Sequence, residues 1–120
     1  MKDDYNRAEE IENEVGGKVI NLCGKYSVNQ SAHIMNHAKF LITHDTGFMH
    51  IAAAFKMKIY SVFGGTHPEL GFTPYLPNPE NKIIQVEKLS CRPCHRYGKS
   101  KCPEGHFNCM NLIDTDLFIE

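Results

Sequence analysis

Residues 44–47 combine side chains and backbone that could bind a phosphorylated sugar. They read His44-Asp45-Thr46-Gly47, and His50 follows one turn later. If a helix begins after Asp45, its unpaired N–H groups and its partial positive charge would attract phosphate. Gly47 would let a ligand approach the backbone closely, and Thr46 can donate a hydroxyl hydrogen bond. Asp45 could accept hydrogen bonds from sugar hydroxyls, and His50 could point toward the same ligand.

Structural roles would explain the same residues. Asp45 could serve only as the N-cap of a helix, and Thr46 and Gly47 only as turn residues. His50 could be a hydrogen-bonded histidine of the core. The usual phosphate-binding patterns, G-x-G-x-x-G and G-x-x-x-x-G-K-[ST], are absent from the sequence. The position of these residues within the fold must therefore decide between the two interpretations.

A second group with chemical potential is a set of four cysteines toward the C-terminus. Their spacing is C-x2-C-x7-C-x6-C, formed by Cys91, Cys94, Cys102 and Cys109. Four thiolates in one short stretch could form a tetrahedral zinc site, with His95 and His106 as spare ligands. Reduced thiols and disulfides are the alternatives, because the second pair does not repeat the C-x2-C step. The fifth cysteine, Cys23, is expected to be a small strand-end residue rather than a nucleophile.

The stretch that carries the four cysteines is also basic. It contains Arg92, His95, Arg96, Lys99 and Lys101. Such a surface could meet a phosphorylated acceptor or make peripheral contact with an anionic membrane. A solvated basic loop is the alternative interpretation.

Composition limits the function classes. The chain has 120 residues, 42% of them hydrophobic, and a formal net charge of −1, so it is typical of a globular domain and gives no general electrostatic reason to bind nucleic acid. Lys56 and Lys58 interrupt the best apolar run, which stays below the roughly 18 residues that indicate a membrane span. The acidic N-terminus lacks the apolar region of a secretory signal, so the cysteines are expected in a reducing compartment.

Alternating helices and strands are predicted to position these residues. Apolar periodicity predicts helices at 4–15, 29–38 and 47–55, and short strands at 19–22, 40–43, 59–63 and 83–86. Short apolar strands that alternate with helices are typical of an α/β fold with a parallel sheet and crossover helices. The helix at 47–55 is apolar nearly all round, so it is predicted to be largely buried. We expect an ordered loop at 64–82, an irregular excursion at 90–110 and the start of another helix near the C-terminus.

Polar and glycine residues follow three of the predicted strands, where such a sheet binds its ligands. Cys23-Gly24 follows the first strand, residues 44–47 follow the second, and Gly64-Gly65-Thr66-His67 follows the third. The carboxyl ends of parallel strands lie at one edge of the sheet, which is the usual ligand site. This placement favours the ligand-binding interpretation, with Gly24 as a further contact.

Three motifs resemble one known family. They are His-Asp-Thr-Gly-Phe-Met-His-Ile-Ala-Ala-Ala at 44–54, Ser-Val-Phe-Gly-Gly-Thr-His-Pro at 61–68, and Val-Ile-Asn-Leu-Cys-Gly-Lys-Tyr-Ser at 19–27. Together with the cysteine spacing, they resemble the C-terminal domain of the ADP-heptose:lipopolysaccharide heptosyltransferases, glycosyltransferase family 9. The resemblance covers most of the chain.

The resemblance implies a fold, a reaction and a set of roles. The family has the GT-B architecture of two Rossmann-like domains, and residues 1–120 would form part of the C-terminal, donor-binding one. Heptose would be transferred from ADP-heptose to a lipopolysaccharide core or lipid A acceptor, in the cytoplasm or at the inner face of the inner membrane. Asp45 would contact the donor sugar, while Thr46 and Gly47 would hold the diphosphate. Catalysis would need no cofactor, because the helix end would stabilise the leaving diphosphate.

The length of the chain departs from this family. The N-terminal acceptor domain with its general base is expected to be missing, as are the first strand and a phosphate-binding lysine of the donor domain. The chain is therefore expected to bind donor weakly and not to catalyse transfer alone. The alternative function is a zinc-stabilised binding or interaction module without catalytic activity, built on the four cysteines.

Overall fold

The computed structural model describes residues 2–75 and 78–119, and the chain divides into two compact units. The first unit is Met1–Ile34 and the second is Met35–Glu120. Each unit is described by itself below. The sheet and all residues of the candidate site, except Gly24, belong to the second unit.

The first unit contains helix α1 (Lys2–Glu14) and most of helix α2 (Val28–Asn36). Helix α1 ends at Gly16 and Gly17, which have φ angles of 65° and 75° that favour glycine. Helix α2 begins with a capping box, in which Ser27 Oγ accepts from Gln30 N (3.3 Å) and Gln30 Oε1 accepts from Ser27 N (2.9 Å). These two local signals account for the predicted helices at 4–15 and 29–38.

The strand predicted at 19–22 does not form, and this prediction was wrong. The backbone of the segment bonds to side chains and turns instead of to a neighbouring strand. Asn21 N donates to Glu12 Oε1 (3.4 Å), and Asn21 Oδ1 accepts from Cys23 N (3.0 Å). The apolar side chain of Ile20 is 80% exposed, so no second layer covers the segment.

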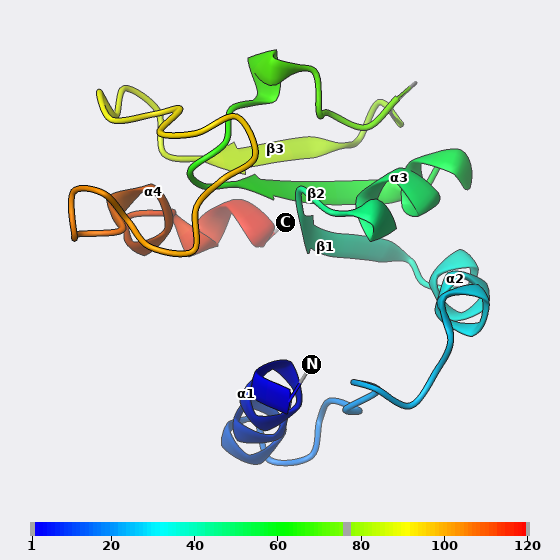
Figure 1. Cartoon of the computed structure of the whole chain (residues 1–120). Coiled ribbons are helices and arrows are strands. Elements are labelled where there is room, and N and C mark those ends of the chain that lie inside the picture. The colour runs from blue at the N-terminus through cyan, green and yellow to red at the C-terminus, as the bar shows by residue number, and fades with distance from the viewer. Residues whose placement is uncertain (1, 76–77, 120) are drawn as a thin grey trace. The chain divides into compact units, whose positions relative to one another are not determined.

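The second unit is built on a three-stranded parallel sheet (Figure 1). Its strands are β1 (Phe40–His44), β2 (Lys58–Phe63) and β3 (Lys82–Gln85), in the order β1-β2-β3. Leu41 lies opposite Ile59, and Ser61 lies opposite Ile83. The central strand β2 is buried at five of its six residues, as expected for an apolar strand covered on both faces. The predicted α/β fold with a parallel sheet is confirmed.

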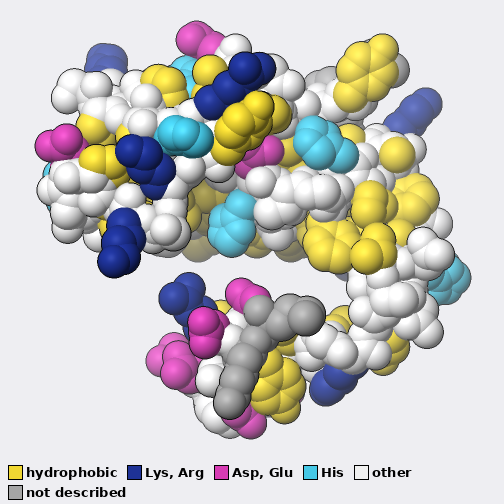
Figure 2. Space-filling view, viewed as in Figure 1, with side chains coloured by type: hydrophobic (Ala, Val, Ile, Leu, Met, Phe, Trp, Pro, Cys, Tyr) yellow, Lys and Arg dark blue, Asp and Glu magenta, His cyan; other side chains and the backbone are white. Residues whose placement is uncertain are grey.

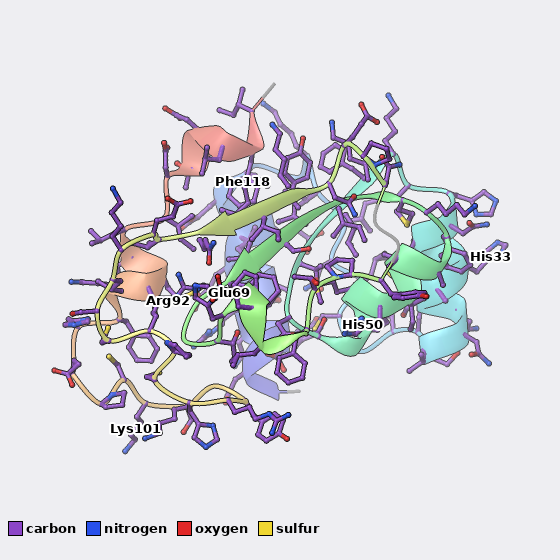
Figure 3. The ribbon with its side chains drawn as sticks, turned by 90° about the horizontal axis from the view of Figure 1, so that it is seen from above. His33, His50, Glu69, Arg92, Lys101 and Phe118 are labelled. Carbon is purple, nitrogen blue, oxygen red and sulfur yellow. The ribbon has the colours of Figure 1, made fainter. Side chains whose placement is uncertain are left out.

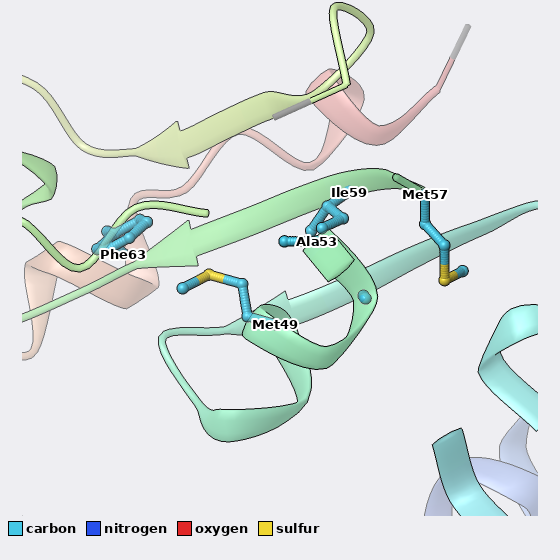
Figure 4. Close-up of a cluster of buried hydrophobic side chains, with 6 residues drawn as sticks. Met49, Ala53, Met57, Ile59 and Phe63 are labelled. Carbon is cyan, nitrogen blue, oxygen red and sulfur yellow. The ribbon is translucent and has the colours of Figure 1, made fainter. Parts of the chain in front are cut away.

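Helix α3 (Gly47–Ala54) packs on one face of β2 and forms the main core (Figure 4). The buried cluster comprises Met49, Ala52, Ala53, Met57, Ile59 and Phe63. Burial of a large apolar side chain such as Phe63 or Met49 contributes about 1.5–3 kcal/mol. The prediction that this helix is largely buried was wrong, since only Met49, Ala52 and Ala53 of α3 are buried and Phe48 is 40% exposed. Only the side of α3 that faces the sheet is covered.

The other face of the sheet is covered by the C-terminal segment. Tyr60, Val62 and Ile84 form a second buried cluster, and Ile113 and Phe118 pack against it. Phe118 belongs to the 3-10 helix η2 (Thr115–Phe118), which Asp114 Oδ1 caps by accepting from Asp116 N (3.0 Å). The C-terminal helix expected from the sequence is therefore this single short turn.

Two irregular stretches complete the second unit. The loop after β2 contains the 3-10 helix η1 (Pro68–Leu70), capped by His67 and ended by Gly71 at φ 87°. Residues 90–110, named the Cys-rich segment below, have no regular element before the short helix α4 (Asn108–Asn111), as predicted. No helix within the described part of the chain is long and apolar enough to cross a membrane.

Candidate functional site

A pocket of about 260 Å³ lies at the carboxyl ends of β1 and β2. We call it the strand-end pocket. Three stretches line it: His44 and Asp45 at the end of β1, Gly64, Gly65 and Thr66 after β2, and part of the Cys-rich segment that includes Tyr97, Gly98, Lys99 and Lys101. Figure 1 shows that the arrows of β2 and β3 point to the edge of the sheet where the Cys-rich segment lies. The pocket therefore occupies the edge that binds ligands in open parallel sheets.

Thr46, not Asp45, is the N-cap of α3. Thr46 has extended backbone angles (φ −142°, ψ 168°), and its carbonyl accepts the first bond of the helix from Met49 N (3.1 Å). Its hydroxyl makes no cap bond and lies 3.3 Å from Thr43 Oγ1. The prediction that Asp45 caps the helix was wrong by one residue. The carboxylate of Asp45 instead lines the strand-end pocket.

Burial and a neighbouring histidine act on Asp45 in opposite directions. Partial burial raises the pKa of the Asp45 carboxyl, and the positive charge of His50 lowers it by a smaller amount. His50 is exposed on α3 and lines a different hollow, with Lys56 and Tyr75. In Figure 3 it stands well away from Arg92 and Lys101.

The remaining residues predicted for donor binding lie outside the lining of the pocket. Thr46 and Gly47 are exposed at the start of α3, directly after Asp45. A side chain added at Gly47 would meet no atom within 4 Å, so this helix end is open to a ligand. Gly24 belongs to the first unit, where it is exposed and has a φ of 71°.

The two glycines after β2 allow the Cys-rich segment to approach the strand end. A Cβ at Gly64 would lie 2.5 Å from Met110 Sδ, and one at Gly65 would lie 3.0 Å from Cys94 Sγ. The carbonyl of Gly65 accepts a hydrogen bond from Cys94 N (3.2 Å). The absence of a side chain at these two positions thus permits close contact between two segments far apart in sequence.

Arg92 ties the strand ends to the Cys-rich segment. Its guanidinium donates to the carbonyls of Gly64 (2.5 Å), Val86 (2.6 Å) and Thr66 (2.8 Å). Longer bonds reach Phe63 O (3.4 Å) and Gln85 Oε1 (3.1 Å). Partial burial lowers the pKa of Arg92. Sequence reasoning placed this arginine only in a basic loop, because its five acceptors come together only after folding.

Lys99 and Lys101 bring positive charge to the strand-end pocket. Both are exposed and line the pocket together with Asp45. The neighbouring ring of Tyr97 lies 6.0 Å from that of Phe72, between centroids, which fixes the segment against the loop after β2. Figure 2 shows Lys, Arg and His side chains gathered over the part of the molecule that carries this segment. The sequence indicated a basic loop but not its position at the pocket.

The four cysteines of the predicted zinc site line a second cavity of about 260 Å³ with Arg92, Glu104 and His106. All five cysteines are reduced. Backbone N–H groups lower the pKa of the Cys102 thiol, whereas burial raises that of Cys109. Among residues 2–75 and 78–119, no group of three or more His, Cys, Asp or Glu side chains already has the arrangement to hold a metal ion. Zinc therefore stays a prediction at this point.

Comparisons with known proteins agree on one family. Residues 1–104 match the family model of glycosyltransferase family 9 (heptosyltransferase). The lipooligosaccharide heptosyltransferase 2 of Campylobacter jejuni serotype O:2 is 32% identical over 96% of this chain and 34% of its own length. The lipopolysaccharide heptosyltransferase 2 of Escherichia coli K12 is 29% identical over 78% of this chain and 24% of its own length. The lipopolysaccharide heptosyltransferase 2 of Salmonella typhimurium is 34% identical, also over 78% of this chain and 24% of its own length. No solved structure shows a significant match.

Proposed function

The chain belongs to glycosyltransferase family 9, the heptosyltransferases, and from this premise we propose that its strand-end pocket holds the sugar and diphosphate of a nucleotide-sugar donor. The observation that carries the proposal is the meeting of three kinds of group at one strand edge. These are the Asp45 carboxylate, the closely packed backbone at Gly64 and Gly65, and the ammonium groups of Lys99 and Lys101.

The size of the pocket limits what it can hold. Its volume of about 260 Å³ is below the roughly 300–1,000 Å³ of typical small-molecule sites. A complete nucleotide sugar would therefore extend beyond it. We assign the sugar and the diphosphate to the pocket, because these are the parts that its polar groups can recognise.

The charges of the lining residues suggest which part of the donor each would contact. Asp45 would accept hydrogen bonds from sugar hydroxyls and would repel a diphosphate placed directly against it. Lys99 and Lys101 would face the diphosphate, together with the open helix end at Thr46 and Gly47. These groups would stabilise the negative charge that develops on the leaving nucleoside diphosphate, so the transfer would need no metal ion.

ADP-heptose is the donor and the lipopolysaccharide core the acceptor that we propose, which places the reaction at the inner face of the inner membrane. The chain spans about a third of the length of the C. jejuni relative. In a full-length family member, the acceptor site and the general base would come from regions that this chain does not cover. We therefore propose that residues 1–120 supply donor binding and do not transfer sugar alone.

Nuclear magnetic resonance titration of the ¹⁵N-labelled chain tests donor binding. ADP-heptose, ADP and UDP would each be added to a sample with dispersed amide signals. We expect shifts at residues 44–47, 64–66 and 99–101, larger with ADP-heptose than with ADP, and smallest with UDP. Shifts shared equally by all three compounds would argue against a sugar subsite at Asp45.

A pair of charge variants supplies the control. The double variant Lys99→Ala/Lys101→Ala should weaken ADP-heptose binding by about a hundredfold or more, since each of the two lost charge-assisted bonds to phosphate is worth about 1.5 kcal/mol or more. Lys39→Ala removes an exposed lysine just before β1, at the opposite edge of the sheet, and should bind like the parent. Equal affinity of all three proteins, or a dispersed spectrum that ignores every nucleotide, would refute the proposal.

A further inference from the structure

We propose that the four cysteines of the Cys-rich segment bind one structural Zn²⁺ ion: Cys91, Cys94, Cys102 and Cys109. This inference goes beyond donor binding and does not depend on it. The ion would close a loop that carries Lys99 and Lys101, and would so hold them at the strand-end pocket.

The first observation is that the fold gathers all four thiols around one cavity, although 18 positions separate the first from the last. Cys109 is buried and the other three are half-buried. Among the described residues, no other cysteine lines that cavity.

Closing the site requires only side-chain and loop adjustment. Zinc binds thiolates at about 2.3 Å in a tetrahedron. Among the described residues no three suitable side chains yet stand that close, so the sulfurs must turn inward. A cysteine reaches another staggered rotamer by rotation about a single bond. The C-x2-C step then supplies the first two ligands from one turn of chain.

The second observation is the backbone around Cys102. Gly105 N donates to the Cys102 carbonyl (3.1 Å), and Gly105 has a φ of 74°, so the chain turns tightly directly after this cysteine. The N–H groups of such a turn could donate to a metal-bound thiolate and orient it.

The third observation concerns charge. A zinc ion with four thiolates carries a net charge of −2, which is costly to bury unless cations stand nearby. Arg92 lines the same cavity as the four cysteines. Lys99 lines it as well. The basic character of the segment therefore complements the charge of a four-thiolate site.

The fourth observation is how little apolar burial orders this segment. Within residues 90–110, all of which are described, Cys109 is the one buried hydrophobic residue. Segments without a sufficient core are commonly fixed by disulfides or by a structural metal. The four cysteines of this segment could supply either, and the thiol assay below distinguishes the two.

Metal analysis of the 120-residue chain, purified under reducing conditions, tests the proposal directly. We expect one zinc per chain, and thiolate-to-metal charge-transfer absorption when cobalt replaces it. Cys94→Ser and Cys102→Ser should each lose most of the metal. Cys23→Ser is the matched control and should keep one zinc per chain, since this cysteine lies outside the cavity.

Thiol counting on the parent protein keeps the test valid if a variant fails to fold. Four of the five thiols should react slowly with a thiol reagent, and a chelator should make them react as fast as Cys23. A folded, reduced sample without zinc, five thiols that react alike with and without chelator, or two disulfides in freshly isolated protein would each overturn the inference. Because no nucleotide is used, a failure here is separate from a failure of donor binding.

Discussion

The sheet of the second unit and its Cys-rich segment are held in place by different forces. The sheet and α3 bury Met49, Ile59 and Phe63 completely. The Cys-rich segment instead relies on the hydrogen bonds that Arg92 donates to Gly64, Val86 and Thr66. Apolar burial is non-directional and involves many residues, whereas most hydrogen bonds that attach this segment come from Arg92, and one more joins Cys94 N to Gly65 O.

Because the two regions are held in place differently, the residues that line the strand-end pocket differ in how firmly they are positioned. Asp45 and the glycines after β2 follow directly from strands of the buried sheet, so their positions share its stability. Lys99 and Lys101 lie on the weakly buried segment and depend on its attachment. A substitution in the Cys-rich segment should therefore be able to displace Lys99 and Lys101 while the sheet stays folded. A substitution that unfolds the sheet should also unfold the Cys-rich segment.

The largest effect is expected from Phe63→Ala in the sheet. Loss of a fully buried phenylalanine costs about 3–5 kcal/mol, a large part of the stability of a small domain. Phe63 has no exposed surface, so both regions should unfold together, as measured by urea denaturation with circular dichroism. Phe48→Ala is the control, because that ring is already 40% exposed and should cost much less. Equal losses in the two variants would contradict the core described here.

Arg92→Met should release the Cys-rich segment and leave the sheet folded. The change leaves the carbonyls of Gly64, Val86 and Thr66 without their donor, and a buried unsatisfied acceptor costs about 1–3 kcal/mol. Hydrogen exchange should speed up in residues 90–110 and stay slow in β2. Arg92→Lys should not restore protection, since an ammonium group cannot reach acceptors spread across a planar fork.

Arg96→Met is the matched control for Arg92. Arg96 is exposed, and its guanidinium lies 5.6 Å from the ring centroid of the exposed Tyr97. Exposed cation–π contacts contribute about 0.5–1 kcal/mol, so exchange should change little. If both arginine variants loosened the segment alike, its attachment would be a general effect of charge and not of the Arg92 bonds.

Strands were predicted correctly from the sequence where an apolar run also pairs with a neighbouring strand in the sheet. The strands at Phe40–His44, Lys58–Phe63 and Lys82–Gln85 were found because each run is bounded by turn residues and enters the sheet. Residues 19–22 have the same local pattern, but in the structure Asn21 bonds to Glu12 and Cys23 instead. Strand pairing is a long-range property, so one run cannot show whether it has a neighbour.

The site was predictable on its sheet side and much less so on its loop side. Asp45 and Gly65 could be placed because topology puts residues after parallel strands at one edge. The one-residue error at the N-cap, Thr46 instead of Asp45, is typical of helix boundaries. Lys99 and Arg92 lie in a segment whose sequence has no hydrophobic periodicity. Only tertiary contacts determine where their side chains lie, so the sequence could not place them.

Gly65→Ala and Gly64→Ala should differ in how they disturb the contact between the two regions. At Gly65 the new methyl group would lie 3.0 Å from Cys94 Sγ, a short side chain whose own backbone bonds to Gly65. At Gly64 it would meet Met110 Sδ, the flexible end of an exposed side chain that can turn away. Overpacking costs about 1–3 kcal/mol where neighbours cannot move, so Gly65→Ala should be the more destabilising. Urea denaturation of the two variants measures the difference, and a loss in Gly65→Ala no larger than that in Gly64→Ala would refute the contact.

The smallest effect on stability is expected from Asp45→Asn, which should nevertheless weaken donor binding. Burial holds the pKa of Asp45 above its unfolded value, so ionisation of this carboxyl opposes folding. The asparagine variant should match the parent in acid and become slightly the more stable as pH rises above about 4, the ordinary pKa of aspartate. Urea midpoints at acidic and neutral pH measure this, with Asp116→Asn as an exposed control. Loss of stability at neutral pH in Asp45→Asn would instead show that the carboxylate supports the fold, and would remove the physical reason to place it in a binding site.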